Sequence, residues 1–319
     1  MLFRSFRGLE VRELALFEGP HGWGEFAPFK DHTLEHSAQW LAAAIEAAYE
    51  DFPQPVRTSV PVNAIVPMLP AVQVDEWVRA VATSTGVSTF KIKCGAADFA
   101  EDVDRVSRVL ATLRELSITN AQIRIDINGA WSVDDAIERI NHIHARADGA
   151  LQYVEQPVAS LADCAVIRSH VDVPIAIDEG VRLLADARLH VDAVRAAGDI
   201  AILKAIPLGG VRRALAVASE LQMPCVVSGS LDSSVGLAQG IALAAALPQL
   251  DYACGFLTGS LLADDLVELT ALPHHGTLTF GRIAPDVDRL TIAQARVDSA
   301  TQTYWRERLS ACYKILEAA

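Results

Sequence analysis

Residues 89–95 read TFKIKCG, a short β-rich run that carries two lysines at alternate positions. Successive side chains of a β-strand point to opposite faces, so Lys91 and Lys93 share one face and the apolar residues share the other. A surface strand would hold both lysines in solvent. A strand inside a closed sheet would instead aim both ammonium groups into one enclosed space, and the neighbouring sequence favours this second arrangement.

The run belongs to a series that begins at residue 60, with Ala-, Leu-, Glu- and Arg-rich segments of helical periodicity between the runs. The series is VPVNAIVP (60–67), TFKIKCG (89–95), QIRIDIN (122–128), LQYVEQP (151–157), PIAIDEG (174–180), IAILKAI (200–206), PCVVSGS (224–230) and DYACGF (251–256). Neighbouring runs start roughly 25 residues apart, the length of one strand–helix unit. Eight strands, each but the last followed by a helix, predict a TIM-type (β/α)7β barrel over residues 60–256.

A doubly wound open sheet is the alternative α/β architecture. Such a sheet usually has fewer strands and often a glycine-rich first turn, yet no GxGxxG follows any of the runs. The barrel is therefore the favoured fold. Asp98, Ser132 and Asp163 stand where the N-caps of three of its helices are expected.

Both ends of the chain lie outside the predicted barrel. Residues 1–59 contain a hairpin-like stretch over 10–29, with residues 19–22 as its turn, and then a predicted helix over 32–50. Residues 257–319 contain short strands and a final amphipathic helix over 301–318. We expect the two ends to join into one small α+β capping domain.

Composition narrows the class of partner and the compartment. Lys and Arg number 27 against 40 Asp and Glu, and a net charge of −13 argues against nucleic acid or a membrane surface as a partner. The five cysteines are scattered without a CxxC pair, which indicates free thiols in a reducing compartment. No signal segment is evident, and the most apolar stretch, 235–247, is too short to span a bilayer. We expect a soluble, cytoplasmic protein that is a monomer or a small homo-oligomer.

Polar and charged side chains stand at the carboxyl ends of the runs, where a barrel of this type places its functional face. They are Lys91, Lys93, Asp126, Asn128, Glu155, Asp178, Glu179, Lys204, Ser228, Gly229 and Ser230. The carboxylates of Asp126, Glu155 and Asp178 come from three consecutive strands, so they converge on one arc of the rim. Like charges so close together repel unless a cation sits among them. Because the donors are all oxygens, Mg²⁺ is favoured over Zn²⁺, with Mn²⁺ as a substitute.

Each of these residues alone has a simpler interpretation, since a strand-end Asp is often an N-cap and a single Lys is usually solvated. The joint pattern, three carboxylates with lysines on both sides, instead favours a reaction centre for a small-molecule carboxylate. Removal of a proton α to a carboxylate needs strong charge stabilisation and a lysine whose pKa falls toward neutrality. Lys91 supplies Lys93 with the second ammonium that promotes such a shift.

These residues lie in motifs that resemble a known family. The motifs are GWGEFAPF (22–29), FKIK (90–93), DINGAW (126–131), YVEQP (153–157), AIDEG (176–180), LKAIPLGG (203–210) and SGSLDSSVGLA (228–238). Together they resemble the enolase superfamily in its muconate-lactonizing-enzyme subgroup, and within it the o-succinylbenzoate synthases of actinobacterial type. The similarity covers nearly the whole chain.

The resemblance implies a syn dehydration of 2-succinyl-6-hydroxy-2,4-cyclohexadiene-1-carboxylate to 2-succinylbenzoate in the menaquinone pathway. It implies that Lys93 abstracts the α-proton and then protonates the departing hydroxide, while Lys204 stays cationic beside the enolate. Lys91 would lie near the substrate carboxylate and keep Lys93 ready to act as a base.

The resemblance also implies ligands and substrate contacts. The Mg²⁺ ligands would be Asp126, Glu155 and Asp178, and the residues near the substrate would be Asn128, Ser228, Gly229 and Ser230. The cap segment would cover the site through Phe26, Pro28 and Phe29 and exclude water. Family members usually have an additional strand before the stretch that matches residues 2–8. The resemblance therefore does not specify which residues of the cap select the substrate here.

Two alternatives stay open from the sequence. A site with two lysines also suits a 1,1-proton transfer, so an N-succinylamino acid racemase or a dipeptide epimerase is the nearest enzymatic alternative. A non-catalytic metal-binding barrel is the other, and the presence of all five charged positions, Lys93, Lys204, Asp126, Glu155 and Asp178, argues against it.

Overall fold

The computed structural model describes residues 11–182, 191–262, 264–268 and 273–318. The segment 2–8, on which the expectation about an additional N-terminal strand depends, lies outside these ranges. None of the helices within them is long and apolar enough to cross a membrane.

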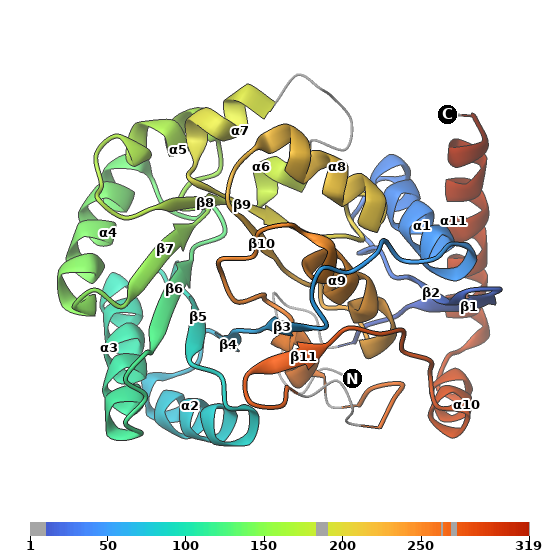
Figure 1. Ribbon diagram of the computed structural model, residues 1–319, viewed down its shortest axis with the longest axis horizontal. Coiled ribbons are helices and arrows are strands. Elements are labelled where there is room, and N and C mark those ends of the chain that lie inside the picture. Colours follow the sequence, from blue (N-terminus) through green and yellow to red (C-terminus); the bar gives the residue numbers. More distant parts are fainter. Residues whose placement is uncertain (1–10, 183–190, 263, 269–272, 319) are drawn as a thin grey trace.

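The chain forms an α/β fold around a curled, parallel seven-stranded sheet with the order β10-β9-β8-β7-β6-β5-β4. Its strands are β4 (Ala64–Val66), β5 (Thr89–Lys93), β6 (Gln122–Asp126), β7 (Leu151–Glu155), β8 (Ile175–Ile177), β9 (Ile200–Leu203) and β10 (Cys225–Val227). Figure 1 shows the strands curving around a common centre. Strands covered on both faces need apolar side chains on both, which explains the nearly continuous apolar runs.

Helices follow the strands and cover the outer side of the sheet (Figure 1). They are α2 (Ala71–Thr85), α3 (Phe99–Glu115), α4 (Val133–Ala147), α5 (Leu161–Arg168), α7 (Val191–Ala197) and α8 (Val211–Leu221), while a short α6 (Glu179–Arg182) follows β8 and α9 (Ser234–Ala246) follows β10. The main hydrophobic core lies between these helices and the sheet. A second apolar cluster lies on the inner side of the strands and comprises Tyr153, Ala176, Ile200, Ile202 and Val226.

The N-caps of two helices are confirmed and a third prediction is wrong. The side chains of Asp98 and Ser132 accept hydrogen bonds from the first turns of α3 and α4. The cap of α5 is Ser160, not Asp163. Asp163 occupies the third helical position, where its N–H donates to Ser160 Oγ and its carboxylate accepts a hydrogen bond from the Ser160 hydroxyl.

The first and last predicted strands differ most from expectation. Residues 60–67 divide into β3 (Ser59–Pro61), which pairs antiparallel with β11 (Thr277–Thr279), and β4, which continues the parallel sheet. Proline has no N–H for the ladder, so Pro61 ends the first piece. Residues 251–256 form only isolated parallel bridges, between Cys254 and Val62 and between Gly255 and Ser228, before the 3-10 helix η2 (Leu257–Leu261) begins.

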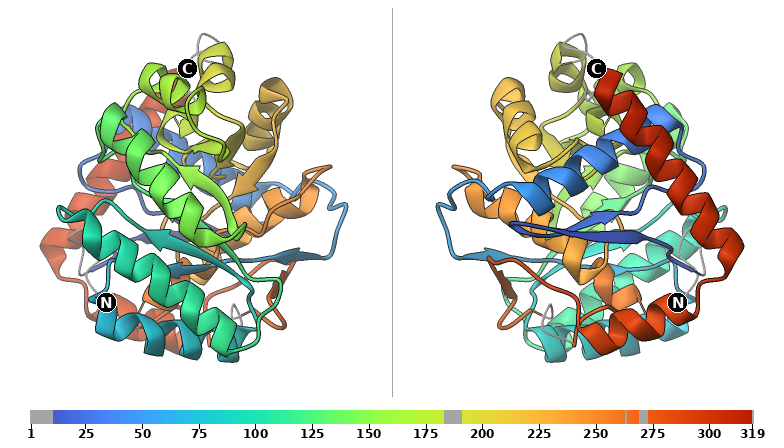
Figure 2. Two further views of the ribbon diagram at one scale, coloured as in Figure 1. Left: turned by 90° about the vertical axis from the view of Figure 1, so that its left-hand side faces the viewer. Right: turned by 90° about the vertical axis from the view of Figure 1, so that its right-hand side faces the viewer.

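The two chain ends pack against each other. The elements are the hairpin β1 (Ala15–Gly19) and β2 (Gly22–Phe26), helix α1 (Leu34–Tyr49), and helices α10 (Val287–Ala295) and α11 (Ser299–Ala318). The predicted turn, N-terminal helix and C-terminal helix are thus confirmed. Figure 2 shows α11 crossing α1 and the hairpin, and their apolar side chains share a core of their own.

Glycine and alanine determine how closely the hairpin approaches α1. A Cβ on Gly24 would lie 2.1 Å from the carbonyl oxygen of Ala44, and one on Gly19 would lie 2.4 Å from that of Ala48. Only residues without a Cβ fit these positions. The same close approach brings Glu25, between Gly24 and Phe26, into the interior.

Candidate active site

Strand register brings the lysines and two carboxylates together. Lys93 of β5 lies opposite Asp126 of β6, which lies opposite Glu155 of β7, because the three strands run in parallel register. Lys91 and Lys93 are only 6% and 9% exposed. The strand TFKIK is therefore interior, and its two ammonium groups are enclosed rather than solvated.

The lysines of β5 each contact carboxylates. Lys91 Nζ donates to both Glu155 oxygens at 2.8 and 2.9 Å and lies 2.9 Å from Asp126 Oδ2. Lys93 Nζ donates to the same Asp126 oxygen at 2.5 Å and to Asn128 Oδ1 at 2.9 Å. Asp126 Oδ2 thus bridges both ammonium groups, which makes Lys91 and Lys93 near neighbours in space as well as in sequence.

A second ion pair stands beyond this cluster along the sheet. Lys204 directly follows β9, and its Nζ donates to Asp178 Oδ2 at 2.6 Å. Asp178 directly follows β8 and is 2% exposed. Its other oxygen lies 3.3 Å from Arg182 Nε of α6 without a hydrogen bond to it. The predicted lysines thus lie on both sides of the carboxylates.

Burial and opposite charge act against each other in this cluster. Burial alone lowers the pKa of Lys91, but Asp126 and Glu155 outweigh it and hold that pKa well above the ordinary value. Burial raises the pKa of Asp126, yet Lys91 and Lys93 outweigh it and lower the pKa strongly. Lys91 is therefore a permanent cation beside Lys93.

The other two carboxyl groups respond in opposite directions. Burial and the charge of Asp126 raise the pKa of Glu155 to about 7. For Asp178 burial is outweighed by Lys204 and Arg182, and its pKa falls to about 2. Glu155 is the carboxylate with the least compensation, so a further cation nearby would stabilise its charged form.

The three carboxylates offer the oxygen ligands that a hard divalent cation prefers. Asp126, Glu155 and Asp178 offer only oxygen and are 1–2% exposed, and Asp178 Oδ1 is buried without a hydrogen bond. Lysine ammonium groups take the other oxygens, so among the described residues no three acidic, His or Cys side chains are arranged around a common ion position. Instead of surrounding one position, the three carboxylates form four ion pairs with the ammonium groups of Lys91, Lys93 and Lys204.

Gln156 is a residue of the site that the sequence interpretation missed. It is 1% exposed, has φ +41°, and its side-chain oxygen accepts the backbone N–H groups of Asp178 and Glu179 at 3.2 Å each. Its amide nitrogen donates to the carbonyl of Val158 at 2.9 Å. Gln156 therefore orients the turn that presents Asp178. The signal available in YVEQP was an amide residue, Gln156, directly after the carboxylate at the end of a strand.

The predicted substrate contacts after β10 lie one strand beyond Lys204. Ser228 is buried and its Oγ donates to the Gly255 carbonyl at 3.3 Å. Ser230 is half-buried, and its N–H donates to Asp232 Oδ2 at 2.8 Å. Asn128, with φ +51°, links Lys93 to Glu179 of α6 through its side-chain amide.

The two N-terminal residues predicted to contact the substrate, Phe26 and Pro28, are both buried. Phe26 has no exposed surface and packs edge-on against Trp305 of α11, with ring centroids 5.8 Å apart. Its apolar ring is buried in the core that the hairpin shares with α1 and α11, so the structure does not bring it to the lysines. Pro28 is also buried. Phe29, partly exposed, packs against Leu231 after β10.

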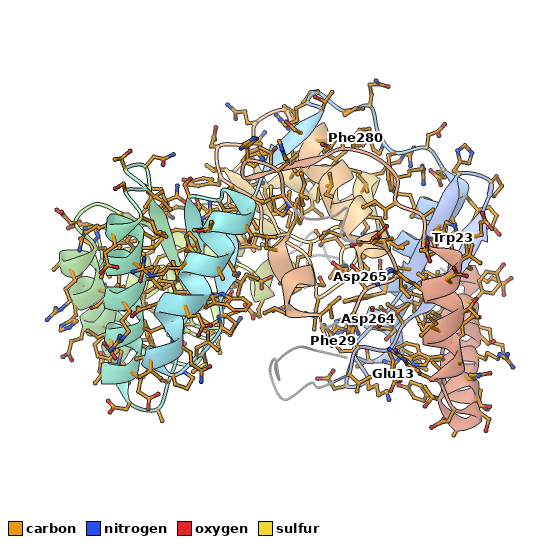
Figure 3. The ribbon with its side chains drawn as sticks, turned by 90° about the horizontal axis from the view of Figure 1, so that it is seen from below. Glu13, Trp23, Phe29, Asp264, Asp265 and Phe280 are labelled. Atoms are coloured by element: carbon orange, nitrogen blue, oxygen red, sulfur yellow. The ribbon has the colours of Figure 1, made fainter. Side chains whose placement is uncertain are left out.

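A cavity of about 1010 Å³ lies between the hairpin and helices α10 and α11. Glu13, Trp23, Asp264 and Asp265 are among its lining residues (Figure 3). None of its described lining residues belongs to the lysine–carboxylate cluster. The cavity is thus separate from the reaction centre indicated by the strand-end charges.

Comparison with known families and proteins agrees with these observations. Residues 73–285 match the family described as enolase C-terminal domain-like, and residues 1–48 match the one described as enolase N-terminal domain-like. The o-succinylbenzoate synthase of Mycobacterium leprae is 44% identical over 313 residues, which cover 98% of this chain and 89% of that protein. The enzyme of the same name from Mycolicibacterium smegmatis is 43% identical over 98% of this chain and 92% of its own length.

Solved structures show the same fold at low identity. The muconate cycloisomerase of Pseudomonas fluorescens superposes with a TM-score of 0.70 at 16% identity and covers 88% of this chain and 92% of that chain. The L-Ala-D/L-Glu epimerase of Bacillus subtilis superposes with a TM-score of 0.67 at 20% identity, covering 83% and 86%. From its sequence relatives and its matched domains, the chain belongs to the enolase superfamily and, within it, to the o-succinylbenzoate synthase family.

Proposed function

We propose that this enzyme catalyses the syn dehydration of 2-succinyl-6-hydroxy-2,4-cyclohexadiene-1-carboxylate to 2-succinylbenzoate, a step of menaquinone biosynthesis. The observation that carries the proposal is the enclosed arrangement of Lys93 and Lys204 on two sides of three buried carboxylates. Relatives named o-succinylbenzoate synthase, at 42–44% identity over 98% of the chain, support the choice of reaction.

Membership of the superfamily implies a divalent metal ion, for which we propose Mg²⁺ with Mn²⁺ as a substitute. Asp126, Glu155 and Asp178 would hold it. When bound, the ion supplies positive charge that stabilises a substrate carboxylate as the α-carbon loses its proton. The protein's own contribution is the placement of the lysines around that carboxylate.

Lys93 carries the proton in this mechanism. As a neutral amine it takes the α-proton, and the electron pair of the C–H bond moves into the enediolate. The resulting ammonium then gives this proton to the hydroxyl group that leaves from the same face, so water departs and Lys93 is again an amine. One group acting at both positions makes the elimination syn.

Two further lysines act by charge. Lys91, which its carboxylate neighbours keep cationic, favours the neutral form of a nearby amine and faces the substrate carboxylate. Lys204, paired with Asp178, keeps its ammonium beside the developing negative charge. Asn128 holds Lys93 through its side-chain oxygen, and Ser228, Gly229 and Ser230 line the distal part of the site.

We also infer a closed (β/α)7β barrel over residues 60–256 and a capping domain formed by residues 1–59 and 257–319. The parallel bridges of Cys254 and Gly255 to the two edges of the sheet support closure. The shared core of the hairpin, α1 and α11 supports the cap. The free, buried cysteines support a cytoplasmic location. We take the enzyme to be a monomer or a small homo-oligomer that binds neither nucleic acid nor membranes.

The test is a direct assay of the purified protein with Mg²⁺ and the cyclohexadiene carboxylate. Aromatisation changes the ultraviolet absorbance, and we expect the change to disappear in Lys93→Ala. The same preparation is then given an N-succinyl amino acid, because lysines on β5 and β9 also suit a 1,1-proton transfer. Unchanged absorbance together with racemisation of the amino acid would assign the chain to racemase chemistry instead.

A further inference from the structure

Glu25 of β2 reaches out of the hairpin to the start of a barrel helix. It has no exposed surface, and its carboxyl group accepts the N–H of Ser233 at 3.2 Å and the N–H of Gly236 at 3.2 Å. Ser233 Oγ donates to it as well. These are donors of the first turn of α9, which otherwise lack partners at a helix start. The hairpin and the helix are therefore joined through one buried side chain.

The backbone of α9 is shaped for this carboxyl group. A Cβ on Gly236 would lie 2.7 Å from both Cδ and Oε1 of Glu25, so any side chain there would displace it. Gly236 is the third residue of α9, and glycine in a helix is less favourable than alanine by up to about 1 kcal/mol. The chain accepts this cost where the carboxyl group meets the helix.

A second cap residue holds the segment just before α9. Arg12 Nε donates to the carbonyl of Leu231 at 3.1 Å, and the Arg12 guanidinium lies 4.5 Å from the ring centroid of Phe29. Leu231 is buried and has φ +64°, a conformation that needs support from its surroundings. Arg12 and Phe29 provide that support from the cap side.

The segment held in this way, residues 228–233, is the loop that follows β10 beside Lys204. Its interior is organised by Asp232, whose Oδ2 accepts the N–H of Ser230 at 2.8 Å. Asp232 is 4% exposed, and its charge is felt by both Arg12 and Lys204. The 228–233 loop thus connects the cap to the side of the reaction centre where Lys204 stands.

We propose that Glu25 is a positioning residue for the reaction: through the first turn of α9 it fixes the 228–233 loop in the conformation that places Gly229 and Ser230 against the substrate. This inference rests on the proposed function for the identity of the substrate. Glu25 touches neither the substrate nor the metal ligands. Its effect passes through Ser233 and the loop backbone.

The raised pKa of Glu25 favours its protonated, uncharged form, so the link between the hairpin and α9 does not depend on a charged carboxylate. Burial and the neighbouring Asp232 raise the pKa of Glu25 to about 8, against the hydrogen bonds from Ser233 and the charge of Arg12. A glutamine of equal length fills the same space and keeps one acceptor oxygen, but its NH2 group cannot accept the second backbone N–H. Glu25→Gln is the conservative variant, and Glu25→Ala is the disruptive one.

A matched control exists on the same helix. Asp265, labelled in Figure 3, accepts the N–H of Ser234 at 3.2 Å and its hydroxyl at 2.5 Å. Asp265 therefore caps α9 as Glu25 does, but from the C-terminal segment, and among the described residues its carboxylate accepts no hydrogen bond from residues 228–233. Asp265→Ala removes a helix cap alone, whereas Glu25→Ala removes the link from the hairpin.

The experiment measures kcat and KM for the four proteins with Mg²⁺, and binding of the product 2-succinylbenzoate by calorimetry. We expect Glu25→Ala to raise KM and the product Kd by on the order of tenfold, Glu25→Gln, which keeps one acceptor oxygen, to give values between those of Glu25→Ala and wild type, and Asp265→Ala to leave both near wild type. Equal effects of Glu25→Ala and Asp265→Ala would reduce Glu25 to an ordinary helix cap and overturn the proposal.

Gly236→Ala separates positioning from helix stability. Alanine raises helix propensity, so a purely structural role predicts a more stable protein with unchanged KM. Displacement of Glu25 by the new Cβ predicts a higher KM, and an unchanged KM in this variant contradicts the proposal.

Amide hydrogen exchange tests the same link without the substrate. In Glu25→Ala we expect the peptide over residues 228–236 to exchange at least about tenfold faster than in Asp265→Ala, beyond any global change. If the wild-type protein does not dehydrate the cyclohexadiene, the proposed function fails, while exchange still decides whether Glu25 holds the loop. Uniformly faster exchange over all strands would overturn the positioning role.

Discussion

Two clusters of this molecule bury carboxyl groups, and they compensate the cost of this burial in opposite ways. At the ends of β5 to β9, each of Asp126, Glu155 and Asp178 contacts a lysine ammonium. Between the hairpin and α9, Glu25 and Asp232 share one guanidinium and rely on backbone N–H groups. The first cluster keeps Asp126 and Asp178 charged, whereas the second favours a protonated carboxyl group.

The difference indicates what each cluster is for. Charge retained at a low-dielectric site is available to stabilise charge that develops in a reaction. A carboxyl group held by backbone donors instead fixes one piece of chain against another, because the donors are rigid parts of a helix. Substitutions in the first cluster should therefore change the rate most, and those in the second should change positioning and pH dependence.

The largest effect is expected from Lys93→Ala. Without its amine no group at the end of β5 can take the α-proton, and we expect kcat to fall by on the order of 10⁴-fold. Stopped-time assays of the ultraviolet change measure it, and an unaltered circular dichroism spectrum is the control for folding. A loss below about tenfold would move the proton transfer to another residue.

A smaller loss of rate is expected from Lys204→Ala. Its ammonium acts only through charge, so we expect kcat to fall by about 10² to 10³-fold. Lys204→Arg keeps the charge, and partial recovery there would confirm an electrostatic role. If arginine restores no activity, Lys204 itself exchanges a proton with the α-carbon, which deuterium incorporation from solvent into the recovered substrate can reveal.

We expect Lys91→Met to have a larger effect on the stability of the protein than on its affinity for the substrate. The change leaves Asp126 with Lys93 as its one lysine partner and leaves Glu155 without a lysine, and breaking a buried ion pair costs about 3–5 kcal/mol. A divalent cation replaces the missing charge, so Mg²⁺ should raise the melting temperature of the variant more than that of the wild type. Thermal unfolding with EDTA and with Mg²⁺ checks this, and equal shifts would contradict it.

The smallest effect is a pH dependence in the second cluster. The folded state raises the pKa of Glu25 from 4.5 to about 8, so unfolding releases a proton between those values and stability falls as the pH rises through that window. Glu25→Gln does not titrate and should lose this slope, by more than about 1 kcal/mol across the window. Urea unfolding at pH 5 and pH 8 measures the difference. Identical slopes in both proteins would assign the titration to Asp232, which faces Glu25 and Arg12.

Much of the first cluster was predictable from the sequence. Lys91, Lys93, Asp126, Glu155, Asp178 and Lys204 occur at the ends of successive runs, and parallel strands in register bring such ends to one edge. Period-two alternation also determined that the two lysines share a face. These relations depend on spacing along the chain, so the sequence alone contains them.

Only the tertiary structure decided the second cluster and the details of the first. Glu25 and Ser233 are 208 residues apart and lie in different strand–helix units, so no local periodicity relates them. The same holds for other details: Phe26 is buried against Trp305, Gln156 holds the turn before Asp178, and Ser160 rather than Asp163 caps α5. These arrangements depend on neighbours distant in space or on backbone dihedral angles. A repeating pattern specifies which face a side chain takes, whereas packing specifies which partner it meets there.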